Sequence, residues 1–168
     1  MSLTSRVVVE ADAEAVARIY NQGIADRIAT FETEPRSLED RLEVIRSSAG
    51  RFPFVVVEID GNVVGFASIS LYRGRDCYRG VGEFSVYVDR AARGQGVGRA
   101  AMAALIAEAE KAGFWKLVSR VFVENTPSRS LLRSIGFREV GIYEKHAKLD
   151  DVWRDCVIVE YMILANVT

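Results

Sequence analysis

A glycine-rich turn between a predicted strand and a predicted helix restricts the fold of this chain more than any other stretch. The segment 93–99 reads RGQGVGR and places glycines at the alternate positions 94, 96 and 98. Glycine loses more conformational freedom on folding than any other residue, so three of them this close together need a physical reason. The alternating run Gly82–Val88 precedes the turn, and the helical pattern of Gly96–Ala112 follows it. The turn therefore joins a strand to the N-terminus of a long helix.

Four explanations of the turn differ in what must surround the glycines. A Walker phosphate loop needs Lys and then Ser or Thr after its last glycine, but Arg99 and Ala100 follow here. A dinucleotide fingerprint needs GxGxxG, whereas the spacing here is GxGxG, and no acidic residue ends the next strand between Val118 and Val123. A flexible surface turn stays open as an alternative. The free N–H groups of the helix's first turn, with Arg93 beside them, favour a site for a phosphate-bearing ligand.

Hydrophobic patterning predicts the elements in the order strand, two helices, three strands, helix, strand, helix and two strands. The expected strands are Arg6–Glu10, Phe54–Ile59, Val63–Leu71, Gly82–Val88, Lys116–Val123, Arg138–Tyr143 and Val152–Leu164, and the expected helices are Ala13–Ala25, one capped by Ser37, Gly96–Ala112 and one that begins at Pro127. Asp12 stands where an N-cap of the first helix would. We expect one α/β (α+β) domain over residues 1–168, with a mostly antiparallel sheet and helices on both faces.

Composition and charge exclude several classes of protein. The chain has 22 Lys and Arg against 23 Asp and Glu, a net charge of −1, which argues against a general nucleic-acid binder. No apolar run approaches the length of a membrane span, and the N-terminus lacks the apolar core of a secretory signal. Cys77 and Cys156 have no CxxC spacing, so we expect free thiols in a reducing cytoplasm and no metal site.

Several motifs together resemble the GNAT superfamily of N-acetyltransferases, in element order along nearly the whole chain. Arg93–Gly98 is similar to its acyl-CoA pyrophosphate loop, Arg/Gln-x-x-Gly-x-Gly/Ala, and Asn125 followed by Gly136-Phe137 matches a second motif. Within the superfamily, the chain resembles the branch that acetylates phosphinothricin, methionine sulfoximine and arsinothricin, and most closely the arsinothricin type, through IYN at 19–21, TFETEP at 30–35, EFSVYV at 83–88 and WRD at 153–155. The resemblance implies a three-layer fold around a mixed, mostly antiparallel sheet of about seven strands.

The resemblance also implies acetyl-CoA as co-substrate and no metal. Backbone groups of the turn would hold the pyrophosphate, and the strand before it, splayed from its neighbour, would pair with the pantetheine arm and polarise the thioester carbonyl. Asn125 is expected to contact the cofactor, to cap the helix at Thr126, or both, and Ser128 is assigned to the cofactor as well. The full set of expected cofactor residues is Val86, Tyr87, Val88, Arg93, Gly94, Gln95, Gly96, Val97, Gly98, Arg99, Asn125 and Ser128.

Acetyl transfer to an α-amine calls for a base, because an amine with a pKa of about 8 is partly protonated at neutral pH. We expect Glu83 to be this base in a direct transfer, since the family places its base at this position; a solvated strand glutamate is the alternative. The family's usual thiolate-protonating tyrosine is replaced by Leu132. Tyr143 is the candidate substitute, and departure of the thiolate without help or by way of water is the alternative. His146 does not fall where the phosphinothricin enzymes carry their histidine. That position is Asp150, which we expect near the substrate.

The expected substrate is a small amino acid or a toxic amino-acid analogue, acetylated on its α-amine by a cytoplasmic homodimer. Three arginines lie within 73–79. Such a run is commonly a solvated loop, but it also suits a bidentate grip on a carboxylate, phosphinyl or arsinyl group. Arg75 matches an arginine of the resembling branch and ranks first, with Arg73 and Tyr78 behind it. Phe31 is expected to pack on the substrate side chain.

Two other functions stay open. An N-acetyltransferase for a protein N-terminus or a lysine would need an open groove, whereas Phe31 and the arginine run favour a closed pocket for an anion. A non-catalytic acyl-CoA-binding protein would keep the glycine turn and have no use for Glu83 or Arg75.

Overall fold

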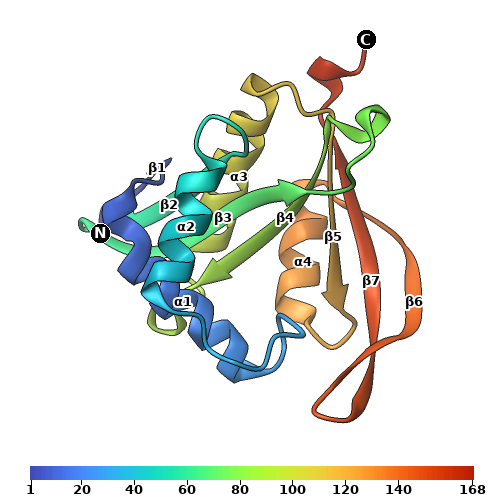
Figure 1. Ribbon diagram of the computed structural model, residues 1–168, viewed down its shortest axis with the longest axis horizontal. Coiled ribbons are helices and arrows are strands. Elements are labelled where there is room, and N and C mark those ends of the chain that lie inside the picture. The colour runs from blue at the N-terminus through green and yellow to red at the C-terminus, as the bar shows by residue number, and fades with distance from the viewer.

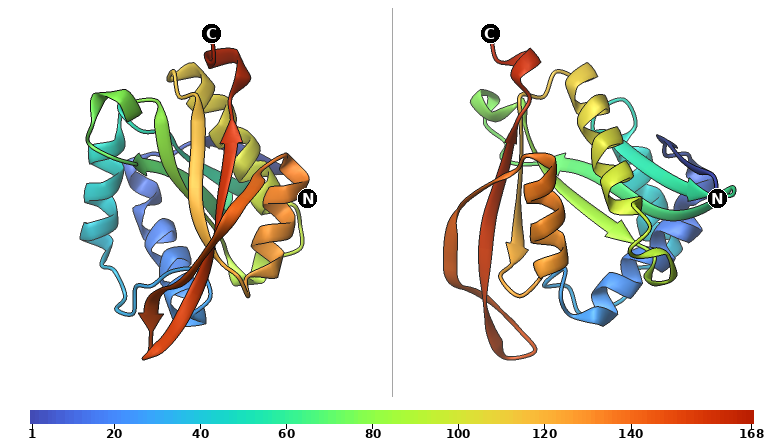
Figure 2. Two further views of the ribbon diagram at one scale, coloured as in Figure 1. Left: turned by 90° about the vertical axis from the view of Figure 1, so that its right-hand side faces the viewer. Right: turned by 180° about the vertical axis from the view of Figure 1, so that it is seen from behind.

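The computed structural model describes residues 1–168 and consists of a seven-stranded sheet between two layers of helices (Figures 1 and 2). The strands are β1 (Leu3–Val7), β2 (Phe54–Ile59), β3 (Asn62–Leu71), β4 (Val81–Val88), β5 (Lys116–Phe122), β6 (Arg138–Leu149) and β7 (Val152–Met162), and the helices are α1 (Ala13–Asp26), α2 (Leu38–Ser48), α3 (Val97–Lys111) and α4 (Thr126–Ile135). This is the predicted order of elements. None of the helices is both long and apolar enough to cross a membrane.

The sheet has the strand order β1-β2-β3-β4-β5-β7-β6, and only β4 and β5 are parallel. The chain leaves β4, crosses through α3 and returns to start β5 beside β4, which is how parallel neighbours arise. The two strands pair only through 81–83 and 116–118, although both continue further. Beyond these residues they diverge, and Figure 1 shows the gap widening towards the start of α4.

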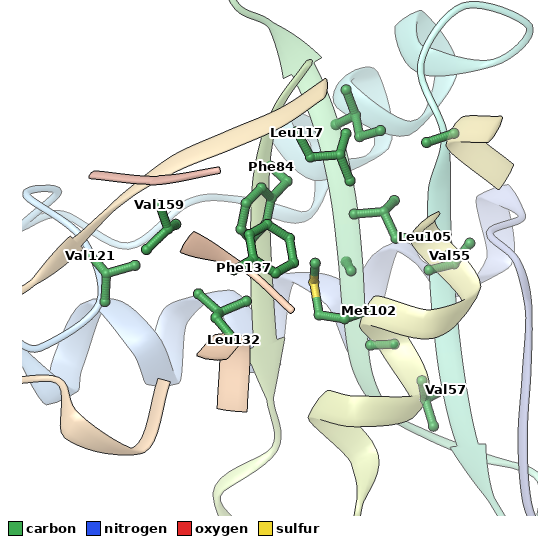
Figure 3. Close-up of a cluster of buried hydrophobic side chains, with 14 of the residues drawn as sticks. Val55, Val57, Phe84, Met102, Leu105, Leu117, Val121, Leu132, Phe137 and Val159 are labelled. Atoms are coloured by element: carbon green, nitrogen blue, oxygen red, sulfur yellow. The ribbon is translucent and has the colours of Figure 1, made fainter. Parts of the chain in front are cut away.

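Each face of the sheet has its own hydrophobic core. On one face α3 and α4 pack against the central strands around Phe84, Met102, Leu105, Leu117 and Leu132 (Figure 3). On the other face α1 and α2 cover a smaller cluster around Ile19, Phe54, Val56 and Phe66. The alternation of β4 divides its side chains as predicted, since Phe84 belongs to the first core and Tyr87 packs against the second.

The N-terminal expectations are wrong in two details. The first strand is Leu3–Val7 rather than Arg6–Glu10, because a short 3-10 turn occupies the residues before α1. Asp12 precedes α1 without capping it. Its carboxylate instead accepts hydrogen bonds from Nη1 of Arg6 and from the backbone N–H of Val9, both at 2.8 Å. This aspartate therefore ties β1 to the turn.

β6 is longer than expected, whereas the start of α2 is as predicted. β6 continues beyond Tyr143 to Leu149, because it pairs again with β7 from Ala147 onwards after an irregular stretch. Residues 144–146 have no register partner on β7, which releases them from the regular pleat. The Ser37 side chain accepts a hydrogen bond from the backbone N–H at the third position of α2, which confirms the predicted cap.

Candidate active site

A cleft of about 410 Å³ lies where β4 and β5 separate. It is lined by side chains of β4 from Glu83 to Tyr87, of β5 from Ser119 to Phe122, of the loop after α1 at Ala29–Phe31, and of the start of α4 at Asn125 and Ser128. Its size falls in the range of small-molecule sites. Residues of α1, β3, β6 and β7 complete the lining, so segments from most of the chain meet at the opening of the sheet.

A second cavity, of about 300 Å³, shares Glu83, Ser119 and Arg120 with the cleft. Its other lining residues are Tyr72, Arg73, Val118, Tyr143 and Ile158. The three shared residues form the boundary between the two spaces. A ligand that reaches Glu83 from the cleft can therefore extend a second group towards Arg73.

Glu83 belongs to a chain of polar contacts along this boundary. Its Oε1 accepts a hydrogen bond from Nη2 of Arg120 at 2.5 Å, and Nη1 of Arg120 lies 3.4 Å from Nε2 of His146. The His146 ring stacks on Tyr143, with ring centroids 4.8 Å apart. The Glu83 and Arg120 side chains are 29% and 47% exposed, so their ion pair contributes little to folding. It holds a carboxylate within reach of a bound ligand.

The edge of β4 that faces β5 is open beyond the last paired residues. Glu83 and Val118 are the final partners, and the Ser119 hydroxyl then donates to the carbonyl of Phe84 at 2.9 Å. From Ser85 to Val88, β4 pairs only with β3. Its remaining backbone donors and acceptors can hydrogen-bond an extended ligand as an added strand would. The splayed strand expected from the resemblance is confirmed.

The turn between β4 and α3 presents a row of free backbone donors. None of the N–H groups of residues 93 to 99 donates to a protein acceptor. Gly94 and Gly96 have φ angles of 79° and 84°, in the left-handed region, and a Cβ on either would meet no atom within 4 Å. Gly98 differs, because a Cβ there would lie 2.8 Å from Cδ2 of Leu131. Two glycines therefore shape the turn, and the third lets α4 approach α3.

Other side chains hold the arginines of the turn. Nη2 of Arg93 and Nη2 of Arg90 donate to the two carboxylate oxygens of Asp26 at 2.8 and 2.6 Å. The hydrogen bond from Arg93, with that from Arg90, keeps the pKa of Asp26 below its usual range. Arg99 donates to the hydroxyl of Ser134 at 2.6 Å. Asp26 therefore anchors the turn to α1 and offsets part of its positive charge.

Asn125 caps α4 and also joins it to the loop after α1. Its Oδ1 accepts from the backbone N–H of Ser128 at 3.3 Å, and its Nδ2 donates to the carbonyl of Ile28, also at 3.3 Å. The predicted capping role is confirmed. Asn125 and Ser128 both line the cleft, and their contact with a cofactor stays a prediction.

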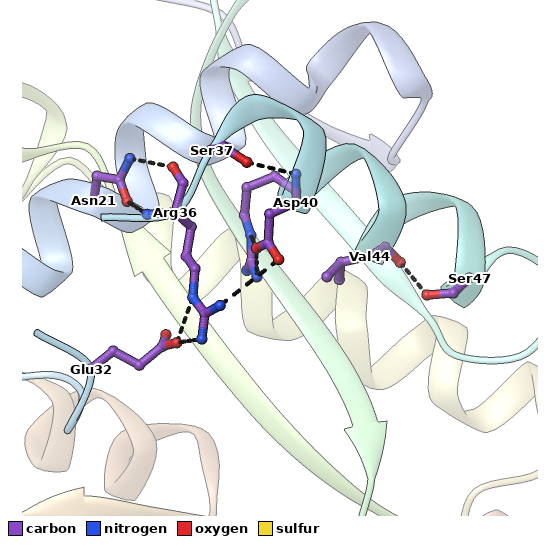
Figure 4. A network of polar contacts seen from close by, with 8 residues as sticks. Asn21, Glu32, Arg36, Ser37, Asp40, Val44 and Ser47 are labelled. Atoms are coloured by element: carbon purple, nitrogen blue, oxygen red, sulfur yellow. Dashed lines mark hydrogen bonds and ion pairs between the residues drawn. The ribbon is translucent and has the colours of Figure 1, made fainter. Parts of the chain in front are cut away.

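The polar loop between α1 and α2 is held against the cleft. Phe31 packs edge-to-face on Phe122, with centroids 4.8 Å apart, and lines the cleft. Nε of Arg36 donates to Glu32 at 2.7 Å, while the Asn21 side chain exchanges two hydrogen bonds with the backbone of Arg36 (Figure 4). One carboxylate oxygen of Glu32 is buried without a partner. These contacts fix the loop, so Phe31 is a preformed part of the wall.

Burial shifts the pKa of two ionisable side chains of the cleft upwards, further from neutral pH. Burial, reinforced by the nearby Glu32 carboxylate, raises the pKa of Tyr87 to about 12. Burial also raises the pKa of the Cys156 thiol, and a protonated thiol is a poor nucleophile. Glu83 is the one carboxylate that lines the cleft. No cluster of three or more His, Cys, Asp or Glu side chains is placed to hold a metal ion.

The predicted substrate residues and the predicted proton donor Tyr143 do not all lie in one place. Phe31 lines the cleft, and Arg73 and Tyr143 line the second cavity. Arg75 and Tyr78 line neither space; they belong to the exposed connection between β3 and β4. The roles of all five residues stay predictions.

Asp150 lies at the turn between β6 and β7 and is linked through Arg27 to the loop between α1 and α2. Its carboxylate pairs with Nε of Arg27 at 3.1 Å. Nη1 of Arg27 donates to the carbonyls of Glu32 and Thr33 at 3.4 and 3.2 Å. Asp150 is outside the lining of both spaces, so its contact with the site runs through Arg27.

Sequence reasoning missed Arg120, and it gave His146 no role in the site. A lone arginine inside a central strand was the available signal for Arg120, because charged residues are rare at such positions without a partner. For His146 the sequence holds no such signal. Its place beside Arg120 depends on the irregular stretch of β6.

Residues 16–137 match the model of the Acetyltransferase (GNAT) family. The chain is 34% identical over 137 residues to an L-methionine sulfoximine/L-methionine sulfone acetyltransferase of Salmonella typhimurium, an alignment that covers 80% of each protein.

Solved structures of N-acetyltransferases superimpose on nearly the whole chain. A phosphinothricin acetyltransferase of Sinorhizobium meliloti, in complex with acetyl-CoA, has a TM-score of 0.90 at 28% identity, covering 96% of this chain and 89% of that one. A ribosomal-protein-alanine N-acetyltransferase of Brucella melitensis has a TM-score of 0.91 at 32% identity, covering 95% and 99%.

Proposed function

Because this chain belongs to the acetyltransferase (GNAT) family, we propose that it transfers the acetyl group of acetyl-CoA directly to the α-amine of a small amino acid or analogue. Phosphinothricin, methionine sulfoximine and arsinothricin are the analogues to consider, and residues 1–168 form one catalytic domain. The observation that carries this proposal is the continuity of β4 with the turn after it. Glu83, an open strand edge and a row of unpaired N–H groups follow one another along the chain.

Acetyl-CoA fits this sequence of groups from its pyrophosphate to its thioester. Phosphate oxygens would accept hydrogen bonds from the N–H groups of the turn, at the positive end of α3. The amides of the pantetheine arm would pair with the open edge of β4 from Ser85 to Val88. A backbone N–H of Val86 or its neighbours would then stabilise the oxyanion that forms on the thioester carbonyl. The S. meliloti relative was solved in complex with acetyl-CoA, which supports acetyl-CoA as the ligand.

Glu83 is the proposed general base. The amine nitrogen attacks the thioester carbonyl, the proton passes to the Glu83 carboxylate directly or through water, and the C–S bond breaks. The departing thiolate of CoA has a pKa of about 8.5 in water, so it can leave as the anion and take a proton from solvent. Tyr143 is the second proposed donor of that proton, besides solvent, and it lines the second cavity rather than the cleft.

The state of Cys156 supports direct transfer over an acyl-enzyme. An acyl-cysteine intermediate would require a thiolate next to the thioester. Cys156 lines the cleft, but burial raises the pKa of its thiol. The amine is therefore the proposed nucleophile.

The amine of a peptide N-terminus is the second candidate substrate, because the B. melitensis relative is a ribosomal-protein-alanine N-acetyltransferase. The loop that carries Phe31 favours a free amino acid, because Phe31 packs on Phe122 and forms part of the cleft wall. Thiol release from acetyl-CoA, measured with phosphinothricin, methionine sulfoximine, methionine sulfone, arsinothricin and alanine-initiated peptides, decides between the two. Turnover of peptides without turnover of free amino acids would reject the proposal.

Replacing Glu83 by Gln separates an enzyme from a non-catalytic acyl-CoA binder. The variant keeps the shape of the side chain and removes its basicity. We expect unchanged acetyl-CoA binding and a loss of turnover of about 100-fold or more, the usual contribution of a general base. Turnover at the wild-type rate would remove Glu83 from the mechanism.

We also propose that the enzyme is a homodimer and that it works in the cytoplasm. β6 is an edge strand, and Val140, Ile142 and Trp153 on the β6–β7 hairpin are 43%, 55% and 52% exposed. A second copy that packs on this face would cover these apolar groups and form a homodimer; light scattering of the purified protein tests this. Two free cysteines fit a reducing compartment such as the cytoplasm, where acetylation would inactivate a toxic analogue.

A further inference from the structure

Given the N-acetyltransferase activity proposed above, we infer that Arg120 makes the enzyme selective for amino acids with an acidic side chain. Its guanidinium binds the anionic oxygens at the end of that side chain while the amine lies at Glu83. The ligand is an α-amino acid that carries a phosphinate, arsinate or similar oxygen acid.

Arg120 stands at the boundary of the two spaces beside the proposed base. Only Glu83, Ser119 and Arg120 line both the cleft and the second cavity. A substrate whose amine reaches Glu83 therefore brings the rest of its atoms past the guanidinium. No other arginine lines the cleft, and Arg73 is the only further one in the second cavity.

The guanidinium has donors to spare. Arginine carries five N–H donors in a planar fork. In this structure Nη2 donates to Glu83 at 2.5 Å, Nη1 has a long contact of 3.4 Å with His146, and Nε makes no hydrogen bond. The side chain is 47% exposed, so the unused N–H groups are accessible. They can form the paired hydrogen bonds that arginine makes with two oxygens of one acid group.

The charge of the lining favours an additional negative group. Among the side chains that line the two spaces, Arg73 and Arg120 are cationic and Glu83 alone is anionic. The α-carboxylate of any amino acid balances one cation, and Arg73 is the partner available for it. Arg120 and Glu83 neutralise each other before the substrate binds. Once Glu83 accepts the proton of the amine, Arg120 is left without its counter-ion unless the substrate supplies one.

A purely structural role accounts poorly for Arg120. Its ion pair with Glu83 is exposed on both sides, and exposed pairs contribute little to stability. Orienting Glu83 is the competing role, and it predicts equal losses for every substrate when Arg120 is removed. Binding of a side-chain anion predicts losses only for acidic substrates.

Phosphinothricin and methionine sulfone form a matched pair for this test. Both are α-amino acids with the same carbon skeleton, and their side chains end in a methylphosphinate anion and in a neutral methyl sulfone. Steady-state kcat/KM for both is measured with the wild type, Arg120→Met, Arg120→Lys and Arg138→Met. Arg138 is the control, because it pairs with Glu160 on the neighbouring strand and lines neither space.

We expect Arg120→Met to lower kcat/KM for phosphinothricin about 10- to 100-fold, the effect of losing a charged hydrogen-bond partner. For methionine sulfone the loss should be about fivefold or less, as for an exposed ion pair. Arg120→Lys keeps the charge without the fork and should fall between these values. Arg138→Met should leave both substrates unchanged, and all variants should keep the wild-type KM for acetyl-CoA.

Two results would overturn the inference while leaving the proposed function intact. Equal losses for the two substrates in Arg120→Met would make Arg120 a positioning residue for Glu83. A wild type that uses methionine sulfone as well as phosphinothricin would show that the side-chain charge is not recognised. If the wild type acetylates peptides and neither amino acid, the proposed function itself fails.

Discussion

Replacing Gly96 by alanine tests whether the shape of the glycine turn serves phosphate binding. Gly96 has a φ of 84° and directly precedes α3. An L-residue in this region costs about 1–2 kcal/mol. A Cβ at Gly96 would meet no atom within 4 Å, so backbone strain accounts for the whole cost. For a chain of this length, 1 kcal/mol lowers Tm by about 2–4 °C. We therefore expect Gly96→Ala to melt about 2–8 °C below the wild type.

Gly113 provides a matched control at the opposite end of the same helix. Its φ is 89°, and a Cβ there would also meet nothing within 4 Å. Gly113→Ala should therefore cost the same stability through the same strain. It lies outside the glycine turn and both candidate ligand spaces. Any difference between the two variants in ligand binding then reports the turn alone.

The decisive measurements are KM for acetyl-CoA and the melting temperature of each variant. Alanine at position 96 relaxes towards negative φ and turns the neighbouring N–H groups away from a bound phosphate. Losing one charge-assisted hydrogen bond is worth about 1.5 kcal/mol or more, a factor of about ten. Gly96→Ala should therefore raise KM for acetyl-CoA about tenfold, and Gly113→Ala should not change it. Equal acetyl-CoA KM values in the two variants would refute the link between this glycine and the phosphates.

Three further outcomes follow from the site. Asp26→Asn should lower the free energy of unfolding at pH 7 relative to the wild type, because Arg93 and Arg90 lower the pKa of Asp26 in the folded state. The unfolded chain takes up this proton first as the pH falls through about 4, so the difference should shrink towards pH 3 in urea titrations; a constant difference would contradict it. Cys156→Ala should retain turnover and show no acyl-enzyme by mass spectrometry, whereas a loss beyond about tenfold would revive a covalent route. Arg75→Ala should raise the KM of the amino acid more than that of acetyl-CoA if its predicted contact exists, and equal changes would count against that contact.

Short-range patterns predicted most of the fold. The order of helices and strands follows from residue spacings of 3.6 and 2, which involve only near neighbours. The Ser37 cap and the left-handed glycines of the turn are likewise local, since each depends on the conformation of a few residues. Errors arose where a distant partner competes with the local signal. Asp12 looks like a cap, yet its carboxylate is bound to Arg6 of β1.

The sequence by itself determined the family, the glycine turn before the long helix and the strand that carries Glu83, because these are contiguous stretches whose meaning does not depend on packing. Only the tertiary structure decided what surrounds Glu83. Arg120 of β5 contacts Glu83 although 37 positions separate the two residues in the sequence. His146 of β6 contacts Arg120 across a further 26 positions. These meetings depend on how far two parallel strands diverge and on an irregular pairing of β6. Both are set by the packing of helices on the sheet and of strands on one another, which no local pattern encodes.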